Sequence, residues 1–337
     1  MTQPRYDVIA IGNAIVDVMA PCQDELIAEL GLNRGGMTLV DTDRAEELYA
    51  AMGSAKEISG GSAANTLAGM AMLGAQCAFI GQVADDQLGA VFAHDIRAVG
   101  IDFDTPPRPL GGDDNPPTAR CLIFVSPDGE RTMNTFLGAS QFLPPAALEE
   151  SMIASAAILY LEGYLWDPEE PRSAMRRAIA VARAAGRKVA FTASESFVID
   201  RHGDDFRALM DEGQIDILFV NEHELASLTG TKDFEAGVAQ VAAKVPVLVA
   251  TRSAAGAIAV ANGTRAEVAA EPVERVIDTT GAGDLFAAGF LFGHARGESL
   301  ERCLRMGAIC AAEIISHYGA RPEADLAALV EARLGRS

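Results

Sequence analysis

The sequence predicts an α/β protein with three layers, α/β/α, around a mostly parallel central sheet, and a small β-sheet lid added to it. Two observations predict this fold class. In the second half of the chain, short apolar strands alternate with helical segments, which is typical of a parallel sheet covered on both faces. In the first half, a β-ribbon interrupts the alternation. The 337 residues, 49% of them hydrophobic, are enough to bury a core of this size.

The first half starts with a buried strand and then departs from simple alternation. The apolar run 7–12 ends in glycine and predicts that strand. Further extended segments are expected at 15–18, 34–40 and 77–81, and helices at 43–52, 67–73 and 86–99. A segment rich in proline and glycine, 106–117, predicts irregular structure.

A hairpin follows this irregular segment. Strands at 118–125 and 131–136 are joined by Ser126-Pro127-Asp128-Gly129-Glu130, a strong turn signal. We expect the hairpin to pair with the extended segments near 15–18 and 34–40. The sequence therefore predicts one α/β domain over residues 1–337, with a discontinuous lid built from about 14–41 and 103–136.

The second half alternates regularly. Strands are expected at 157–162, 188–193, 215–220 and 245–251, and helices at 171–185, 205–211 and 235–244. A hairpin around Asn262-Gly263 joins strands at 256–261 and 265–270. The chain ends in helices expected at 283–296, 300–315 and 324–334.

The composition excludes several classes of protein. The net charge of −20, without a basic patch, argues against a nucleic-acid partner. The longest apolar run, near 285–293, is too short to span a membrane, and we expect no membrane association. The N-terminus lacks a signal-peptide pattern. Five scattered cysteines fit reduced thiols, so we expect a cytoplasmic protein.

The most informative stretch is Asp278-Thr279-Thr280-Gly281-Ala282-Gly283-Asp284, which leads directly into an apolar helix. The unpaired N–H groups and the dipole at a helix N-terminus favour an anion, most often a phosphate. A carboxylate beside that anion would repel it unless it takes a proton from the attacking group. Asp284 therefore indicates phosphoryl transfer to a hydroxyl, whereas a lone glycine turn would be read as an ordinary helix start.

Other common enzyme motifs are missing from the sequence. There is no G-x-x-x-x-G-K-S/T, so the chain is not a P-loop enzyme. Phe286 stands where a dinucleotide fingerprint needs glycine. Ala64 occupies the last glycine position of a serine-hydrolase elbow. The histidines lack zinc-type spacing.

Two stretches together resemble the signatures of the ribokinase-like, pfkB-type sugar and nucleoside kinases. They are Gly60-Gly61-Ser62-Ala63-Ala64-Asn65 and the Asp278–Asp284 stretch, which lie in the family's order. Asn221…Glu224 and Thr251…Gly256 also fall where the family has nucleotide motifs, so the resemblance covers essentially the whole chain. It implies the ribokinase-like fold, the use of ATP and Mg²⁺, and a small-molecule acceptor.

The resemblance assigns roles residue by residue. Asp284 is implied as the base, and the amides of Gly281, Ala282 and Gly283 as the anion hole. The implied sugar-binding residues are Asn13, Asp17, Gly60, Gly61 and Asn65. Asn221 and Glu224 are implied to organise Mg²⁺, Glu224 through water, and the implied nucleotide-binding residues are Thr251, Ser253, Gly256 and Arg131, the last on a phosphate. Asp278 and the carbonyl of Thr280 match a site for a monovalent cation such as K⁺.

The acceptor is less clearly indicated. Gly61-Ser62-Ala63 and Ser316-His317-Tyr318-Gly319-Ala320 resemble the adenosine-kinase-like branch, whereas ribokinases usually have lysine at the position of Ser62. The sequence thus predicts phosphorylation of adenosine to AMP, with a ribokinase- or fructokinase-like sugar or sugar-phosphate kinase as the alternative. A non-catalytic nucleoside- or sugar-binding protein on the same fold is a further alternative. A purine slot could be lined by Met37, Leu39, Leu122, Phe124, Phe136 and Phe142. The oligomeric state is expected to be monomer or homodimer.

Overall fold

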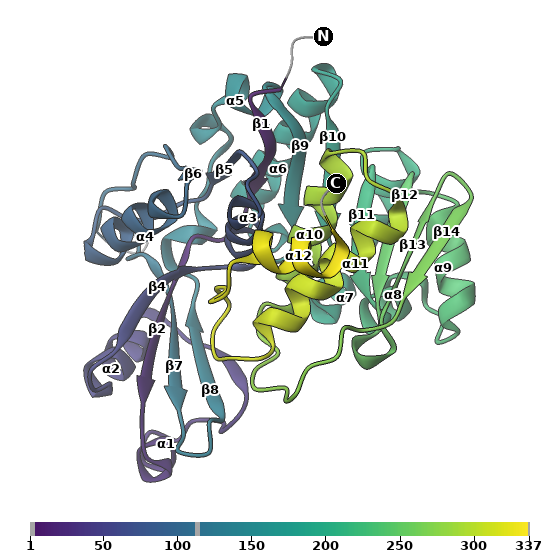
Figure 1. Ribbon diagram of the computed structural model, residues 1–337. Helices are drawn as coiled ribbons and strands as arrows, with labels where there is room; N and C mark the ends of the chain where they lie inside the picture. The colour runs from purple at the N-terminus through teal and green to yellow at the C-terminus, as the bar shows by residue number, and fades with distance from the viewer. Residues whose placement is uncertain (1–3, 112–114, 336–337) are drawn as a thin grey trace.

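A computed structural model describes residues 4–111 and 115–335. Its larger sheet has the strand order β14-β13-β12-β11-β10-β9-β1-β5-β6 (Figure 1). The strands from β6 to β12 in this order pair in parallel, and β13 and β14 close one edge as an antiparallel hairpin. The bounds are β1 (Tyr6–Ile11), β5 (Cys77–Ile80), β6 (Ile101–Asp102), β9 (Ala156–Glu162), β10 (Lys188–Thr192), β11 (Ile217–Asn221), β12 (Val247–Thr251), β13 (Ala257–Ala261) and β14 (Thr264–Val268).

Helices cover both faces of this sheet. One face carries α5 (Glu150–Ala154), α6 (Glu169–Ala184), α7 (Ser196–Asp211), α8 (Glu222–Thr229) and α9 (Phe234–Ala242). The other carries α3 (Ser62–Met72), α4 (Gln87–Ala98), α10 (Ala282–Ala295), α11 (Leu300–Ile314) and α12 (Leu326–Leu334). Short 3₁₀ helices lie at Gly138–Gln141, Pro145–Ala147, Gly163–Trp166 and Ser253–Ala255.

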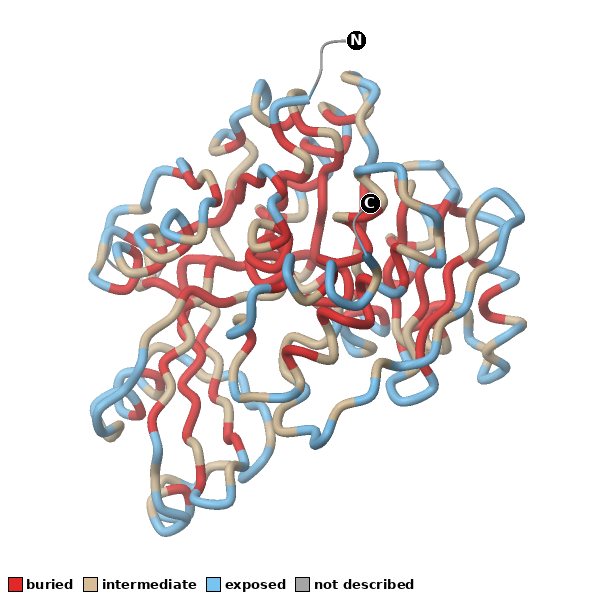
Figure 2. Tube along the Cα trace, in the orientation of Figure 1, coloured by how far each residue is buried: buried red, intermediate tan, exposed pale blue. Residues whose placement is uncertain are grey.

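Alternate residues of the first strand enter two separate cores. Val8 and Ala10 belong to the core under α3 and α10, and Ile9 and Ile11 belong to the core on the opposite face. Because side chains alternate along a strand, an unbroken apolar run is the pattern of a strand buried on both sides. Figure 2 shows the strands of this sheet as the largest buried part of the chain. The predicted three-layer α/β/α fold is confirmed.

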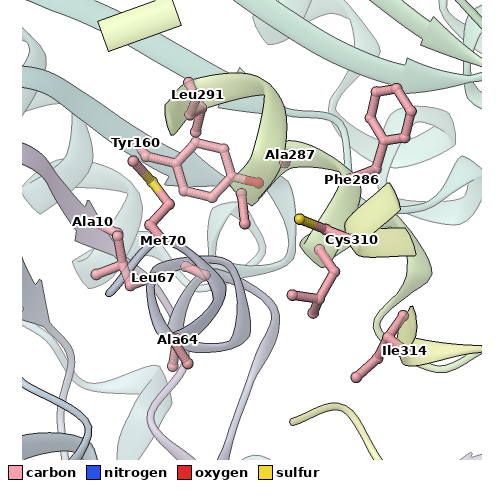
Figure 3. Packing of buried hydrophobic residues seen from close by; sticks show 14 of the residues in the cluster. Ala10, Ala64, Leu67, Met70, Tyr160, Phe286, Ala287, Leu291, Cys310 and Ile314 are labelled. Atoms are coloured by element: carbon pink, nitrogen blue, oxygen red, sulfur yellow. The ribbon is translucent and has the colours of Figure 1, made fainter. Parts of the chain in front are cut away.

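Close packing of α3 on α10 brings the N-termini of these two helices together. A Cβ atom at Gly69 would lie 2.5 Å from Leu285 Cδ1 and 2.8 Å from Ala288 Cβ, so only glycine allows this approach. Figure 3 shows Leu67 and Met70 of α3 lying near Tyr160 of β9 and the α10 side chains in the same core. The packing fixes the place of Asp284, which lies in the first turn of α10.

A smaller sheet of strand order β3-β8-β7-β2-β4 extends from one end of the main body (Figure 1). Its strands are β2 (Ile15–Pro21), β3 (Met37–Leu39), β4 (Lys56–Gly60), β7 (Ala119–Val125) and β8 (Arg131–Phe136), and it carries α1 (Asp24–Glu29) and α2 (Thr42–Ala51). The hairpin of β7 and β8 is the one expected from the sequence. The strand β4 lies outside the predicted ranges, because Lys56-Glu57-Ile58 is too polar to indicate an edge strand.

Four helices differ from expectation. Helices α1 and α5 lie outside the predicted helix ranges. Helix α7 begins at Ser196 and not at 205, because burial of Val198 and Ile199 outweighs the low helix propensity of β-branched residues. Helix α8 was not expected as a complete helix. Among the described residues, every helix is too short or too polar to cross a bilayer.

Candidate active site

The centre of the candidate site is the carboxylate of Asp284 at the start of α10. Ser62 Oγ donates a hydrogen bond to its Oδ1 at 2.6 Å, and Asn65 Nδ2 donates to its Oδ2 at 3.1 Å. Burial raises the pKa of Asp284, and the two hydrogen bonds act against that rise. The carboxylate is thus oriented by two neutral donors from one helix, an arrangement that suits a proton acceptor.

The first turn of α3 carries the other signature. Gly61 caps this helix at φ +94°, and a Cβ there would lie 2.2 Å from the Asn13 carbonyl oxygen. A Cβ on Gly60 would lie 2.6 Å from Asp17 Oδ2. Both glycines are therefore required by close contacts with predicted sugar-binding residues. Burial raises the pKa of Asp17 to about 6, although Arg131 and Arg321 lower it.

A fully buried carboxylate, Glu162, supports this arrangement from the end of β9. Its Oε1 accepts hydrogen bonds from the backbone N–H and Nδ2 of Asn13, both at 2.7 Å. Its Oε2 accepts the N–H of Ala63 at 2.8 Å. Burial raises the pKa of Glu162 to about 7 against these donors. Glu162 thus joins the loop after β1 to the first turn of α3.

On the other side of the glycine turn, Asp278 pairs with Arg131 of β8. The guanidinium of Arg131 donates to Asp278 Oδ2 and, at 3.1 Å, to Thr280 Oγ1. The N–H groups of Thr280 and Gly319 donate to the same carboxylate, each at 3.0 Å. Burial would raise the pKa of Asp278, but these donors outweigh it and hold the pKa below its usual value. The guanidinium of Arg131 therefore occupies the carboxylate of Asp278, which the resemblance assigned to a monovalent metal cation such as K⁺.

The glycine turn itself presents backbone donors. Gly281 caps α10 in the left-handed region at φ +79°. The N–H of Ala282 donates within the turn to the Thr279 carbonyl at 3.2 Å. Among the described contacts, the N–H groups of Gly283 and Asp284 have no protein acceptor. The turn therefore keeps donors at a helix N-terminus for an anion, while the amide of Ala282 is partly used by the turn.

Apart from Arg131, which lies on β8 against Asp278, the predicted nucleotide residues form a second cluster at and after the ends of β11 and β12. Asn221 and Thr251 are direct neighbours in the parallel register. Asn221 caps α8, and Glu224 Oε2 accepts the Asn221 N–H at 3.0 Å in a reciprocal capping box. Burial raises the pKa of Glu224 to about 7. Gly256, at φ +86°, would place a Cβ 2.0 Å from the Val268 carbonyl oxygen, so its glycine is required by the β12–β13 turn.

The donor set here suits a magnesium ion held mainly by phosphates. Within residues 4–111 and 115–335, no group of three or more His, Cys, Asp or Glu residues is arranged to hold a metal. Mg²⁺ commonly keeps its waters and takes one or two carboxylates together with substrate phosphates. Asn221 and Glu224 would meet that requirement through water.

Tyr164 follows β9 in the 3₁₀ helix Gly163–Trp166 and is affected by the charges of both clusters. Burial raises the pKa of Tyr164, and the carboxylates of Glu195, Asp284, Glu224 and Glu162 add to this rise. Tyr164 therefore lies within the electrostatic reach of both the Asp284 cluster and the Glu224 cluster.

With this geometry in view, comparison with known proteins decides the family. Residues 20–326 match the pfkB family of carbohydrate kinases. The chain belongs to this family. It is thus a kinase of the sugar and nucleoside class, and the resemblance drawn from the two signature stretches is confirmed.

Solved structures of the family are similar over nearly the full length. An adenosine kinase from Sinorhizobium meliloti is 46% identical, with a TM-score of 0.88, over 98% of this chain and 99% of that one. A probable sugar kinase from Rhizobium etli is 44% identical, with a TM-score of 0.89, over 98% and 99%. Among relatives compared by sequence alone, a fructokinase from Klebsiella pneumoniae is 31% identical over 70% of this chain and 76% of its own.

The purine slot expected in this pfkB kinase needs correction. Leu122, Phe124 and Phe136 are buried in the core beneath α1 and α2, on the face opposite Asp17. Phe142 lies in a separate cavity beside Arg108. The strand register places another row on the face of Asp17, namely Cys121, Thr135 and Leu39.

The sequence did not indicate three residues of the site. Ser62 was considered only as a helix cap and as a marker of the branch. Glu162 carried a usable signal, since it is a lone carboxylate at the end of an apolar strand, where parallel sheets bind ligands. Arg321 lies in an irregular segment after α11, and nothing in its surroundings in the sequence indicates contact with α3.

Proposed function

We propose that this pfkB kinase uses ATP and Mg²⁺ to phosphorylate the primary hydroxyl of a ribose-bearing acceptor, with adenosine as the acceptor and AMP as the product. The observation that carries the proposal is the Asp284 carboxylate, fixed by Ser62 and Asn65 beside the open N–H groups of the glycine turn. Phosphoryl transfer to an alcohol requires a proton acceptor and a site that binds the phosphoryl oxygens, and this helix N-terminus supplies both.

In this mechanism, the acceptor hydroxyl lies against Asp284. The carboxylate takes the hydroxyl proton as the oxygen attacks the terminal phosphorus of ATP, and the bond from that phosphorus to the bridging oxygen breaks to release ADP. The N–H groups of Gly283 and Asp284 and the α10 dipole stabilise the negative charge on the phosphoryl oxygens. Mg²⁺, when bound through water to Asn221 and Glu224, would neutralise charge on the phosphates. Arg131, expected to reach a phosphate, is paired with Asp278 and would add little net positive charge there.

The ribose hydroxyls would be held at the other end of the site. Asp17 and the backbone of Gly60 form one wall, and Asn65 reaches the same space while orienting Asp284. The Asn65 Oδ1 atom is buried and has no protein partner, so an acceptor hydroxyl would satisfy it. These groups suit an acceptor that carries neighbouring hydroxyls.

Two observations favour a neutral nucleoside over a sugar phosphate. The cations that act on Asp17 are Arg131 and Arg321, and both guanidinium groups donate to protein oxygens. An acceptor phosphate would meet carboxylates there. On the Asp17 face of the small sheet, Met37 and Leu39 are 46% and 54% exposed, which gives a base an apolar surface to cover. The similarity to a fructokinase keeps a neutral hexose as the second candidate.

The test is ADP release from ATP and Mg²⁺ with a panel of acceptors: adenosine, other nucleosides, ribose, fructose and fructose phosphates. We expect adenosine to give the highest kcat/KM, and the product to carry phosphate on its primary hydroxyl. Asp284→Asn tests the base itself, because it keeps the size of the side chain and one acceptor oxygen but removes the carboxylate. This variant should bind ATP and lose kcat by roughly two to four orders of magnitude.

Each alternative has its own outcome in this experiment. Preferred turnover of fructose or ribose would replace adenosine by a sugar. No ADP release with any acceptor would favour a non-catalytic binding protein. Near-normal turnover by Asp284→Asn would show that another group accepts the proton.

A further inference from the structure

A short segment after α11 contacts three parts of the candidate site. The N–H of Gly319 donates to Asp278, and Ala320 packs on the glycine turn, where its Cβ lies 3.0 Å from the place of a Cβ on Gly281. Arg321, the next residue, reaches the first turn of α3. In Figure 1 this part of the chain runs between α11 and α12, beside the small sheet. The segment thus joins elements that are far apart in the sequence.

The guanidinium of Arg321 makes three directed hydrogen bonds. Nε donates to the Ser59 carbonyl at 2.9 Å, Nη2 to Ser59 Oγ at 2.8 Å, and Nη1 to the Ala64 carbonyl at 2.9 Å. Ser59 belongs to β4 and Ala64 to α3. The planar fork therefore fixes both ends of the backbone loop 59–64 in one geometry.

This loop contains Ser62 and leads directly into Asn65, the two residues that orient the base. Gly60 lies under Asp17, Ser62 donates to Asp284, and Asn65, which directly follows Ala64, donates to the other oxygen of Asp284. A shift of the loop would therefore move both donors to Asp284 together. The positive charge of Arg321 also lowers the pKa values of Asp17 and Asp284, against the effect of their burial.

We propose that Arg321 is a positioning residue for phosphoryl transfer, which fixes the loop 59–64 so that Ser62 and Asn65 hold the Asp284 carboxylate in its reactive orientation. The inference rests on the proposed kinase activity. Arg321 is not placed against the acceptor or the nucleotide, since its hydrogen bonds among the described residues all go to protein oxygens.

The experiment compares Arg321→Met, Arg321→Lys and Ser59→Ala in steady-state kinetics with the preferred acceptor. Arg321→Met removes all three bonds, so kcat should fall by about 100-fold, the loss expected when reacting groups are misplaced by about 1 Å. The KM for ATP should stay within about threefold, because the nucleotide cluster has no contact with Arg321. Arg321→Lys and Ser59→Ala should be intermediate, each losing roughly tenfold in kcat.

The matched control is Arg302→Met. The guanidinium of Arg302 also donates to two backbone carbonyls, those of Leu334 and Gly335, but these belong to the C-terminal end of α12. Arg302→Met should keep the kcat of the unchanged protein. Melting temperature is measured for every variant, so that kcat is expressed per folded molecule.

The proposal is overturned if Arg321→Met keeps more than half of kcat, if its loss only follows the folded fraction, or if Arg302→Met loses as much. Should Arg321→Met not fold, unchanged kcat in both Arg321→Lys and Ser59→Ala overturns it equally. Inactivity of the unchanged protein with every acceptor would instead count against the proposed function.

Discussion

The fold requires only one of the two glycines of the glycine turn, Gly281 and Gly283. Gly281 has a positive φ, and a Cβ there would lie 3.0 Å from Ala320 Cβ, so its glycine serves the backbone. Gly283 lies inside α10, where an added Cβ would meet no atom within 4 Å. The described contacts give no reason in the fold for glycine at 283, which fits the phosphoryl position proposed for this turn.

Gly283→Ala should therefore separate stability from activity. Alanine in a helix is favoured over glycine by about 1 kcal/mol, so the melting temperature should stay the same or rise. The methyl group would project into the space assigned to the phosphoryl group, and kcat should fall at least about tenfold. Calorimetry and ADP release on the same preparation check both parts. Full activity in a stable variant would show that the phosphoryl group does not bind at this turn.

Single residues differ in how well sequence reveals them. Asp284 and its glycines were predictable because charge and backbone freedom occur together in one short stretch. Glu162 and Arg321 were not, because their roles depend on partners about 100 to 260 positions away, as in Glu162 with Ala63 and Arg321 with Ser59. No local pattern contains such a contact, whereas the packing of α3 on β9 and α10 creates it.

At the scale of the elements, the small sheet shows that hydrophobic periodicity does not determine which face of a strand points toward the site. The hairpin of β7 and β8 was predictable from its turn, but which face of each strand looks toward the site was not. Alternation defines two faces without saying which one a helix covers. Here α1 and α2 cover the face of Leu122 and Phe124, and the face of Asp17 remains for the site.

The small sheet is joined to the main body by a buried ion pair. The side chains of Arg131 and Asp278 are only 6% and 7% exposed. Removing one partner of such a pair leaves a buried charge without compensation. Arg131→Met should therefore lower the free energy of unfolding by roughly 3 kcal/mol at pH 7, and Asp278→Asn in the same chain should restore part of the loss.

Urea denaturation of the two single variants and the double variant measures this coupling. The matched control is Arg34→Met, which breaks an exposed ion-pair cluster with Asp24 and Asp128 on the same sheet and should change stability little. Equal losses in Arg131→Met and Arg34→Met, or strictly additive effects of the two buried substitutions, would contradict the role given to this pair.

For the whole molecule, the main electrostatic feature is a protein of net charge −20 that buries several site carboxylates. Burial raises the pKa of Asp17 to about 6 and those of Glu162 and Glu224 to about 7. Unfolded carboxyl groups titrate near pH 4. Between these values the folded chain holds more protons than the unfolded chain, so stability falls as pH rises. Carboxyl groups with lowered pKa values, such as that of Asp278, gain and lose their proton at lower pH, so they do not affect stability in this range.

The melting temperature should therefore fall steadily from pH 5.5 to pH 8. Glu162 alone, with its pKa raised from 4.5 to about 7, would contribute on the order of 3 kcal/mol between full protonation and full ionisation. Glu162→Gln should reduce this slope, although it leaves one of the N–H groups of Asn13 or Ala63 without an acceptor. Scans at low and high salt separate the buried groups from general repulsion, since salt screens surface charge far more than buried charge. A melting temperature independent of pH, or an unchanged slope in both Glu162→Gln and Glu224→Gln, would mean that these carboxylates titrate normally, and the site would then be more open to water than its packing indicates.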